Sequence, residues 1–407
     1  MRKYLQSIFR KILNFLSLIL FVVAISNANG QGFNTAATWY HVEYGNRIAA
    51  LGQSSSALDN RVAFHINPAI PVKSGTLNLS SFLLSSAPFP TLILTDQPIL
   101  YNPSASIGLN KWTIGAKMDY TQWGSESLTN NTRILRFNVA RELFDNFSIG
   151  IGISHIDDND DLTTGVRGVN ANGFMFSTGI HYNYPFPLFG IKLNPQIGIA
   201  LTDIGEKLSY NIEGQNLQTG QSISTTNFLT TPGQLRTSIG LDIATQEKIA
   251  NQHFVQIGLY LGFNKYMGGF NEFEESNNTF TLISGFDMIT STWSSFERFN
   301  GTEFTRIELF EQISNSFGIE LGLMETLFFQ FGTIGGADLW IRPQKNYGVT
   351  LDLFYVSLSY TDFNYKSSDQ WTFDDWSTSV WSLDVRIPFD GTSHNTLLGS
   401  LIQRIKN

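Results

Sequence analysis

The chain of 407 residues contains no cysteine. This absence excludes disulfide scaffolds, zinc sites with Cys ligands, iron–sulfur clusters and thiol catalysis. Charged residues make up only 15% of the chain, well below the roughly 25% that is usual for a soluble globular domain. The net charge is −8 and there is no Lys/Arg-rich block. Nucleic acid is therefore excluded as a partner, because phosphates require a basic surface.

Apolar runs long enough for a transmembrane helix are also absent beyond residue 30. The mean hydropathy of −0.06 is too low for a bundle of such helices. A membrane β-barrel reconciles the low charge with the moderate hydropathy, because alternate residues of each strand face lipid and the others face water.

The first thirty residues have the pattern of a signal peptide. Arg2, Lys3, Arg10 and Lys11 precede an apolar run over residues 12–24, which is shorter than the roughly 20 residues that a spanning helix needs. Small residues at Ala28 and Gly30 predict cleavage between Gly30 and Gln31. Removing these four basic residues changes the net charge from −8 to −12 (−8 − 4). The alternative is an uncleaved N-terminal anchor.

Period-two alternation runs through many segments of the remaining chain. In the last of them Trp381, Leu383, Val385, Ile387 and Phe389 alternate with Ser382, Asp384, Arg386 and Pro388. Such alternation indicates strands with one apolar and one polar face. Segments of nine to twelve residues match the roughly 9–11 residues that a tilted transmembrane strand needs. We therefore predict an all-β fold, a transmembrane antiparallel β-barrel of about 14 strands.

The alternating segments give these predicted strands: 77–84, 104–109, 112–121, 132–141, 147–156, 173–184, 190–202, 233–244, 253–263, 316–322, 326–332, 345–353, 356–363 and 380–389. Short links at 110–111, 144–146 and 354–355 are expected on one side of the barrel. Longer polar links at 157–172, 203–232, 264–315 and 364–379 are expected on the other. The link 264–315 contains apolar pieces and is expected to fold over the barrel as a partly ordered cap.

Glycine occupies inner-face positions in several predicted strands, including Gly150, Gly198 and Gly258. Glycine weakens a strand, so it usually marks a bend or a close approach of another backbone. Two interpretations stay open: the glycines relieve curvature in a tilted closed sheet, or they leave room for a plug or ligand inside the barrel.

The segment before the first strand carries a family resemblance. Leu51-Gly52-Gln53, Ser56-Ala57 and Asn67-Pro68-Ala69 resemble the N-terminal signature of FadL-like outer-membrane proteins. The resemblance implies that residues 31–75 form a short helical hatch with Gly52, Ala57, Asn67, Pro68 and Ala69 as its motif residues. Residues 76–389 would then be the barrel.

Within that superfamily the body is similar to the PorV/PorQ group of the type IX secretion system of Bacteroidetes. The similarity spans residues 45–389 and includes Asn138 to Gly150, Leu201 to Tyr210 and Leu235 to Leu241. It implies that secretion channels and cargo proteins with C-terminal secretion domains are partners, beside outer-membrane lipid. Two departures stand out. Ala49, Ala50 and Gln53 replace the family's usual Gly or Met, and a tail follows Phe389.

The tail, residues 390–407, has Leu397, Leu398, Leu401, Ile402 and Ile405 at the spacing of an amphipathic helix. Such a helix either folds against the periplasmic mouth of the barrel or docks a periplasmic partner.

No catalytic, cofactor-binding or metal-binding residues are predicted. The six histidines have no metal-ligand spacing, and Ser154 and His155 point to opposite faces of one strand. The run Asp157 to Asp161 begins like a calcium loop, but Leu162 and Gly168 stand where an EF-hand needs Gly and Glu. It is interpreted as a solvated loop, with weak calcium binding as the alternative. Trp371, Phe373, Trp376 and Trp381 are interpreted as an interfacial aromatic girdle, or alternatively as a ligand-stacking site.

Two functional hypotheses follow. The first is a non-enzymatic outer-membrane component of type IX protein secretion, as the PorV/PorQ resemblance implies. The second is FadL-like transport of a hydrophobic small molecule, with a ligand in the lumen and a lateral exit. A lumen lined by Phe and Leu, with a kink at one strand, would favour transport. A polar or plugged lumen, with an exposed apolar patch among the links 203–232 and 264–315, would favour partner binding.

Overall fold

The fold is taken from a computed structural model of the chain. It describes residues 46–52, 57, 63–84, 99–125, 128–160, 166–167, 169–215, 222–246, 248–249, 252–267, 271–274, 279–282, 284–290, 293, 296–299, 304–307, 309, 313–336, 342–353, 355–366 and 376–388. The predicted signal peptide, the tail after Pro388, Trp371 and Phe373 lie outside these residues. Within them, no helix has the length and apolar character needed to cross a membrane.

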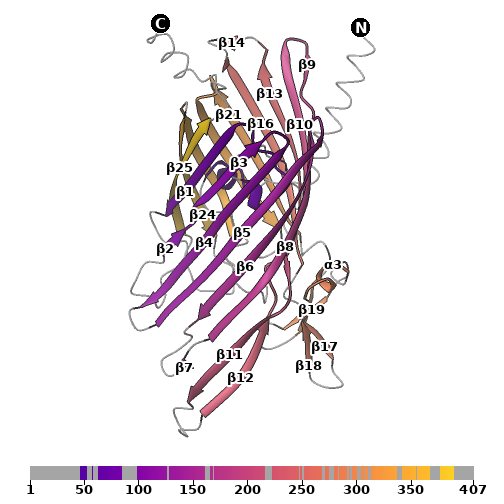
Figure 1. The fold of residues 1–407 in the computed structure, drawn as a ribbon, viewed down its shortest axis with the longest axis vertical. Helices are drawn as coiled ribbons and strands as arrows, with labels where there is room; N and C mark the ends of the chain where they lie inside the picture. Colours follow the sequence, from indigo (N-terminus) through magenta and orange to yellow (C-terminus); the bar gives the residue numbers. More distant parts are fainter. Residues whose placement is uncertain are drawn as a thin grey trace.

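One large antiparallel sheet closes on itself to form a barrel (Figure 1). The sheet has 16 strands, of which β2 and β3 share one place in the wall, and β9 (Phe186–Leu188) lies in line with β8. The wall therefore has 14 places. In order they are β1 (Thr76–Leu84), β2 (Ile99–Tyr101) with β3 (Ser104–Leu109), β4 (Trp112–Ser125), β5 (Leu128–Phe144), β6 (Phe147–Asp160), β8 (Val169–Asn183), β10 (Ile191–Gly205), β13 (Gln234–Thr245), β16 (Val255–Tyr266), β21 (Ile313–Leu323), β22 (Leu327–Gly336), β23 (Arg342–Asp352), β24 (Val356–Lys366) and β25 (Trp376–Pro388).

The first and last strands close the wall. β1 pairs with β25 along its whole length, from Thr76 opposite Pro388 to Leu84 opposite Val380. Because β1 pairs with β25, neither the first nor the last strand is left as a free edge of the sheet. The predicted barrel of about 14 strands is confirmed, and each predicted strand is present.

Alternation along the strands separates two faces. In β6, Ile149, Ile151 and Ile153 are exposed on the outside, whereas Gly150, Gly152 and Ser154 face the lumen and are buried. The other wall strands follow the same pattern, so the outside of the barrel carries an apolar band and the lumen is lined mainly by polar side chains. The outer face of β6 becomes polar at His155 and Asp157, which ends the band on that strand.

The two ends of the barrel differ. Tight turns join strands at one end, here called the short-turn end, at residues 110–111, 145–146 and 324–326. Asn110 and Asn146 adopt φ of 52° and 69° there, a backbone conformation that Asn tolerates better than most residues. The predicted turns at 110–111 and 144–146 are confirmed.

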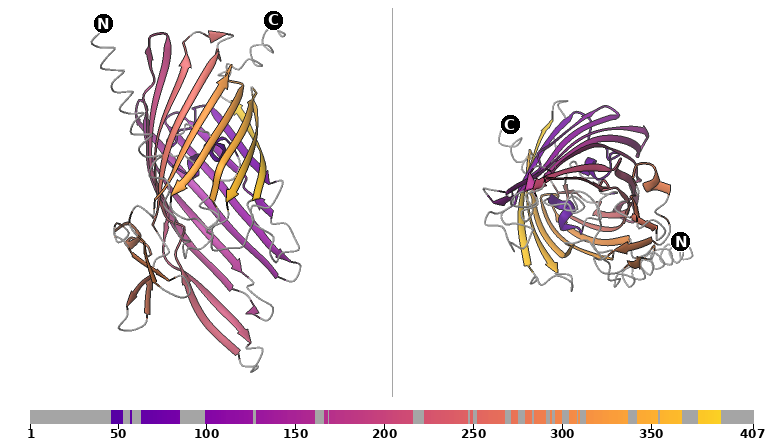
Figure 2. Two further views of the ribbon diagram at one scale, coloured as in Figure 1. Left: turned by 180° about the vertical axis from the view of Figure 1, so that it is seen from behind. Right: turned by 90° about the horizontal axis from the view of Figure 1, so that it is seen from below.

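The opposite, long-loop end carries additional structure. β7 (Val166–Arg167), β11 (Leu208–Gln215) and β12 (Ser222–Leu229) form a small sheet whose hairpin projects beyond the barrel (Figure 2). The other short pairs are β17 (Asn271–Glu274) with β18 (Thr279–Leu282) and β19 (Phe296–Phe299) with β20 (Phe304–Ile307). The helix α3 (Asp287–Thr290) packs on the rim, where Met288 contacts Ile204 and Met267. At the short-turn end, β14 (Lys248–Ile249) pairs with β15 (Gln252–His253).

One sequence interpretation is wrong. Asp157, Asp158, Asn159 and Asp160 belong to the end of β6 and do not form a solvated loop. The alternation continues through them, so Asp157 faces outward and pairs with Arg133 at 3.0 Å, while Asp158 faces inward and accepts a hydrogen bond from Thr132. Among the described residues, no three His, Cys, Asp or Glu side chains are grouped to hold a metal ion.

Exposed aromatic side chains gather at the short-turn end. Phe144 stacks with Phe147 and Tyr182 with Tyr184, and the guanidinium of Arg141 lies 4.9 Å from the ring centroid of Trp112. Such rings are typical of the boundary between lipid and water. Of the predicted girdle, the side chain of Trp381 is described: it is exposed on β25 and packs against Tyr360.

Candidate functional site

A part of the chain that precedes β1 lies inside the barrel, and we call residues 46–52, 57 and 63–72 the lumen segment. It contains the helix α2 (Asn46–Ala50) and the single 3-10 turn η2 (Ala63–His65). Ile48, Leu51, Ala63, Ile66, Ile70 and the wall residue Tyr260 form a buried apolar cluster. The segment therefore has a small core of its own within a polar lumen.

The helix α2 is fixed to the wall by charge and by backbone contacts. Arg47 donates from Nε and Nη2 to the carboxylate of Glu320 on β21, a side chain with no exposed surface. Asn346 on β23 donates to the backbone oxygen of Ala49 at 2.8 Å. Charge-assisted bonds with two donors are among the stronger contacts that side chains make. They position α2 on the side of the wall made by β21 to β24.

The Asn67-Pro68-Ala69 end is fixed to the opposite side of the wall. Asn67 donates from Nδ2 to the oxygen of Ile180 on β8 at 3.0 Å, and its Oδ1 accepts from the amide of Ala69 at 3.0 Å. Ser148 on β6 donates to the oxygen of Ala69. The lumen segment thus spans the lumen between two faces of the wall (Figure 2).

Two wall side chains hold Ala57 between these ends. Its amide donates to Ser238 Oγ on β13, and its oxygen accepts from His181 Nε2 on β8 at 3.0 Å. All five motif residues predicted from the sequence therefore lie where the lumen segment meets the wall. No local pattern points to His181 or Glu320, because their partners lie more than 120 residues away in the chain.

Wall glycines make room for the lumen segment. A Cβ added to Gly150 would lie 2.2 Å from the oxygen of Pro68, and one added to Gly179 would lie 2.1 Å from Asn67 Oδ1. On the other side, a Cβ at Gly332 would lie 2.0 Å from the amide nitrogen of Gly52. At these positions the glycines therefore make room for a segment inside the barrel, which is the second of the two interpretations considered for the inner-face glycines. Gly258 differs, because the ring of Tyr260 occupies the space beside it.

The wall is interrupted between β1 and β4. β3 pairs with β1 over Thr76–Ser80, but β2 pairs with it only through Leu83 and Tyr101, so Ser81 and Phe82 have no partner on that side. Asn102 and Pro103 separate the two short strands. Proline has no amide hydrogen and cannot continue a ladder. We call the place in the wall formed by the unpaired Ser81 and Phe82 and by Asn102 and Pro103 the wall break.

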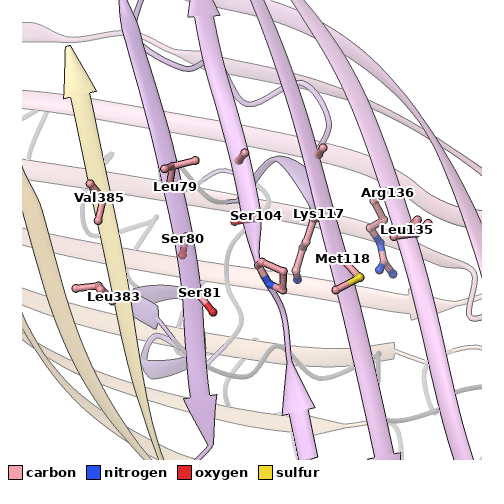
Figure 3. Close-up of a pocket in the computed structure, with 13 residues that line it drawn as sticks. Leu79, Ser80, Ser81, Ser104, Lys117, Met118, Leu135, Arg136, Leu383 and Val385 are labelled. Carbon is pink, nitrogen blue, oxygen red and sulfur yellow. The ribbon is translucent and has the colours of Figure 1, made fainter.

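A pocket of about 590 Å³ lies at the wall break (Figure 3). Outward-facing residues from five wall places make its rim: Leu79, Ala105, Met118, Leu135, Leu383 and Val385. Lumen-facing Ser80, Lys117 and Arg136 also line it. The pocket therefore opens on the apolar outside of the barrel and reaches side chains that belong to the lumen.

A chain of buried ion pairs lies behind the pocket. Lys117 Nζ is 3.0 Å from Asp119 Oδ1, Arg136 pairs with the other oxygen of Asp119, and Arg136 Nη2 is 3.1 Å from Asp203 Oδ2. Two cations and two carboxylates neutralise one another, which offsets the cost of burying each charge. The four side chains behind the pocket therefore carry individual charges, but their net charge is zero.

Asp203 reaches this chain from an irregular backbone. The pairing of β10 with β8 shifts between Leu201 and Ile204, and Asp203 has a φ of 56°. Its amide donates to Ser177 Oγ at 3.0 Å. A bulge turns a side chain that regular alternation would point elsewhere, and here it brings Asp203 to Arg136. The sequence placed Asp203 in a link, so this contact was not predicted.

The wall break lies next to the lumen segment, toward the long-loop end. On β4, Thr113 accepts from the amide of Val72, and a Cβ at Gly115 would meet the ring of Phe64. Lys117, which lines the pocket, is the next inward residue along the same strand. A molecule that enters the lumen from the long-loop end would thus reach the wall break first and would then be stopped by the lumen segment.

No protein-family model matches the chain, and no curated protein matches it. Several solved structures are similar. The Ralstonia pickettii toluene transporter TbuX matches 89% of this chain and 99% of its own, with a TM-score of 0.46 and 12% identity. The CymD monoaromatic hydrocarbon channel matches 87% and 99%, with a TM-score of 0.49 and 11% identity. A Pseudomonas aeruginosa FadL homologue matches 88% and 100%, with a TM-score of 0.43 and 13% identity.

Proposed function

We propose that this chain is an outer-membrane β-barrel that carries a hydrophobic small molecule and releases it sideways through the wall break. The observation that carries the proposal is the pocket at that break, which joins the apolar outside of the barrel to lumen-facing side chains. A membrane barrel with unbroken pairing would offer no such route.

The path follows from three features. The lumen segment occupies the lumen toward the short-turn end, so straight passage is obstructed there. The wall break lies on the long-loop side of that obstruction. The rim of the pocket is apolar, and a hydrophobic molecule that leaves through it enters lipid without crossing water. The proposal includes no enzymatic activity.

The proposal also assigns parts of the chain. Residues 1–30 would be the signal peptide, cleaved near Gly30, and residues 390–407 a periplasmic tail. Residues 31–75 would act as a hatch inside the barrel of residues 76–389. Gly52, Ala57, Asn67, Pro68 and Ala69 would hold the hatch against the wall.

A deletion strain tests the transport proposal. Its uptake of a panel of radiolabelled alkanes, fatty acids and aromatics is compared with that of the same strain carrying the gene on a plasmid. We expect slower uptake of at least one compound class in the deletion strain and its restoration by the plasmid. Equal uptake of every compound would contradict transport.

A second candidate is a component of type IX secretion, resembling PorV/PorQ. One observation favours it: the lumen is lined by polar side chains and crossed by the lumen segment, an arrangement that suits a binding protein better than an open conduit. Affinity purification of the barrel from outer membranes tests this candidate. Recovery of a secretion channel, or of cargo with C-terminal secretion domains, would support it, and recovery of neither would exclude it.

A further inference from the structure

Arg236 on β13 is a deeply buried cation without an acceptor. The residue is 4% exposed, and neither its Nε nor its Nη1 has a hydrogen-bond partner. None of the ion pairs formed within the described residues involves Arg236. A buried arginine almost always pairs with an acceptor, because its charge cannot be removed by deprotonation.

The guanidinium belongs to the lumen side of the wall. Ser238, two residues further along β13, contacts Ala57 of the lumen segment. Since residues two apart in a strand share a face, Arg236 also faces the lumen. It lies on the long-loop side of Ser238, because β13 runs from that end toward the short-turn end.

Other buried cations of the lumen, unlike Arg236, pair with carboxylates. Lys117 and Arg136 pair with Asp119, Arg136 pairs also with Asp203, and Arg386 pairs with Asp352. Asp203, which follows Thr202 on β10, pairs with Arg136 through Oδ2, while its Oδ1 is buried and has no hydrogen-bond partner. The unmatched charge at Arg236 is therefore not the general condition of this lumen.

The neighbours of Arg236 add hydrogen-bond donors. Thr202 on β10 pairs with Gln234, which makes it the diagonal neighbour of Arg236, at a Cα separation of about 7–8 Å. Its hydroxyl is buried and has no partner. Directly opposite Arg236 stand Ala200 on one side and Asn264 on the other, so the neighbour on β10 contributes only a methyl group. The guanidinium and this hydroxyl together offer donors of the kind that an anion accepts from.

We propose that Arg236, with the hydroxyl of Thr202, binds a compact inorganic monovalent anion, such as chloride or bromide, in the lumen. The anion accepts hydrogen bonds from the guanidinium and the hydroxyl, and it neutralises the buried charge. This site is separate from the wall break, so anion binding here does not depend on whether the barrel transports a hydrophobic compound.

Thermal unfolding of the purified barrel in detergent tests the site. Sodium bromide is compared with sodium gluconate at equal ionic strength, because gluconate is a large organic anion and the proposed site takes a compact inorganic one. Saturating bromide is expected to raise the Tm of the wild type by roughly 3–5 °C. Arg236→Met removes the charge and should abolish the difference between the two salts. Arg236→Lys keeps the charge but loses the planar donors, so it should show a smaller difference.

Arg133→Met is the matched control, because Arg133 is an exposed arginine at the rim. It should retain the full bromide effect and thereby account for any general action of the salt. Crystals grown in bromide should show an anomalous peak at the guanidinium of Arg236 in the wild type and none in Arg236→Met. Equal salt dependence of wild type and Arg236→Met, or a wild-type crystal without that peak, would overturn the proposal.

Discussion

Among single residues, Glu320 joins the wall to the lumen segment through a buried charge. Its side chain has no exposed surface and accepts hydrogen bonds from Arg47 and, at 3.1 Å, from Gln330. Removing one member of a buried ion pair leaves the other charge without compensation, which costs more than an exposed pair contributes. The stability of the lumen segment should therefore depend strongly on this one carboxylate.

Glu320→Gln should lower the free energy of unfolding by about 3 kcal/mol, because Arg47 stays buried without a counter-charge. Urea unfolding of the purified barrel in lipid measures this. Asp157→Asn is the control, because it removes an exposed pair with Arg133 and should cost less than about 1 kcal/mol. Equal losses in the two variants would contradict the assigned role of Glu320.

Gly150 is a second point where the wall and the lumen segment meet, and here the contact depends on the absence of a side chain. Gly150→Ala should destabilise the barrel by about 1–3 kcal/mol, because the added methyl group would lie 2.2 Å from the backbone oxygen of Pro68. Gly173→Ala is the matched control on the neighbouring strand, where the methyl group meets only the flexible end of Leu208. Heat denaturation followed by gel mobility compares the two. A Gly150→Ala barrel as stable as the control would show that the lumen segment yields at this point.

Among the elements, the lumen segment and the wall are held together by different forces. The wall strands pair with one another through continuous ladders, whereas the lumen segment touches them through side chains and glycine contacts. The barrel should thus keep its wall when the segment is removed, and the polar lining would then be hydrated.

Deletion of residues 31–72 should convert the protein into a water-filled pore. Single-channel recording in planar bilayers should show resolved conductance steps for the deletion variant and few or none for the full chain. The same preparations should give equal barrel content by circular dichroism. A deletion variant that folds but conducts no better than the full chain would argue that the segment does not close the lumen.

The strands of this barrel were predictable from sequence because alternation is a local property. Each of the 14 wall places was found, and the errors lie at strand ends such as Asp157 to Asp160, where the outward face turns polar while pairing continues. The lumen contacts were not predictable. Asn67 with Ile180 and Arg136 with Asp203 depend on which strands face each other across the lumen. The wall break did have a local signal, since Pro103 directly precedes the predicted strand 104–109, but a proline at that point could also mark an ordinary turn.

At the scale of the whole molecule, a polar lumen crossed by a buried segment lies inside an apolar exterior, and the strand pairing of the wall is interrupted beside that segment. This interruption is the proposed exit for a hydrophobic molecule. Ala105 lines the pocket from the outer face, and Ile151 is exposed on the outer face of β6 away from it. Tryptophan at the first position fills the pocket, whereas tryptophan at the second only enlarges the apolar band.

The most direct test is the uptake rate of the labelled hydrophobic panel by the deletion strain carrying wild type, Ala105→Trp or Ile151→Trp at equal surface amounts. We expect Ala105→Trp to slow uptake severalfold and Ile151→Trp to match the wild type. Uptake through Ala105→Trp at the wild-type rate, or no uptake through the wild type itself, would contradict an exit at the wall break.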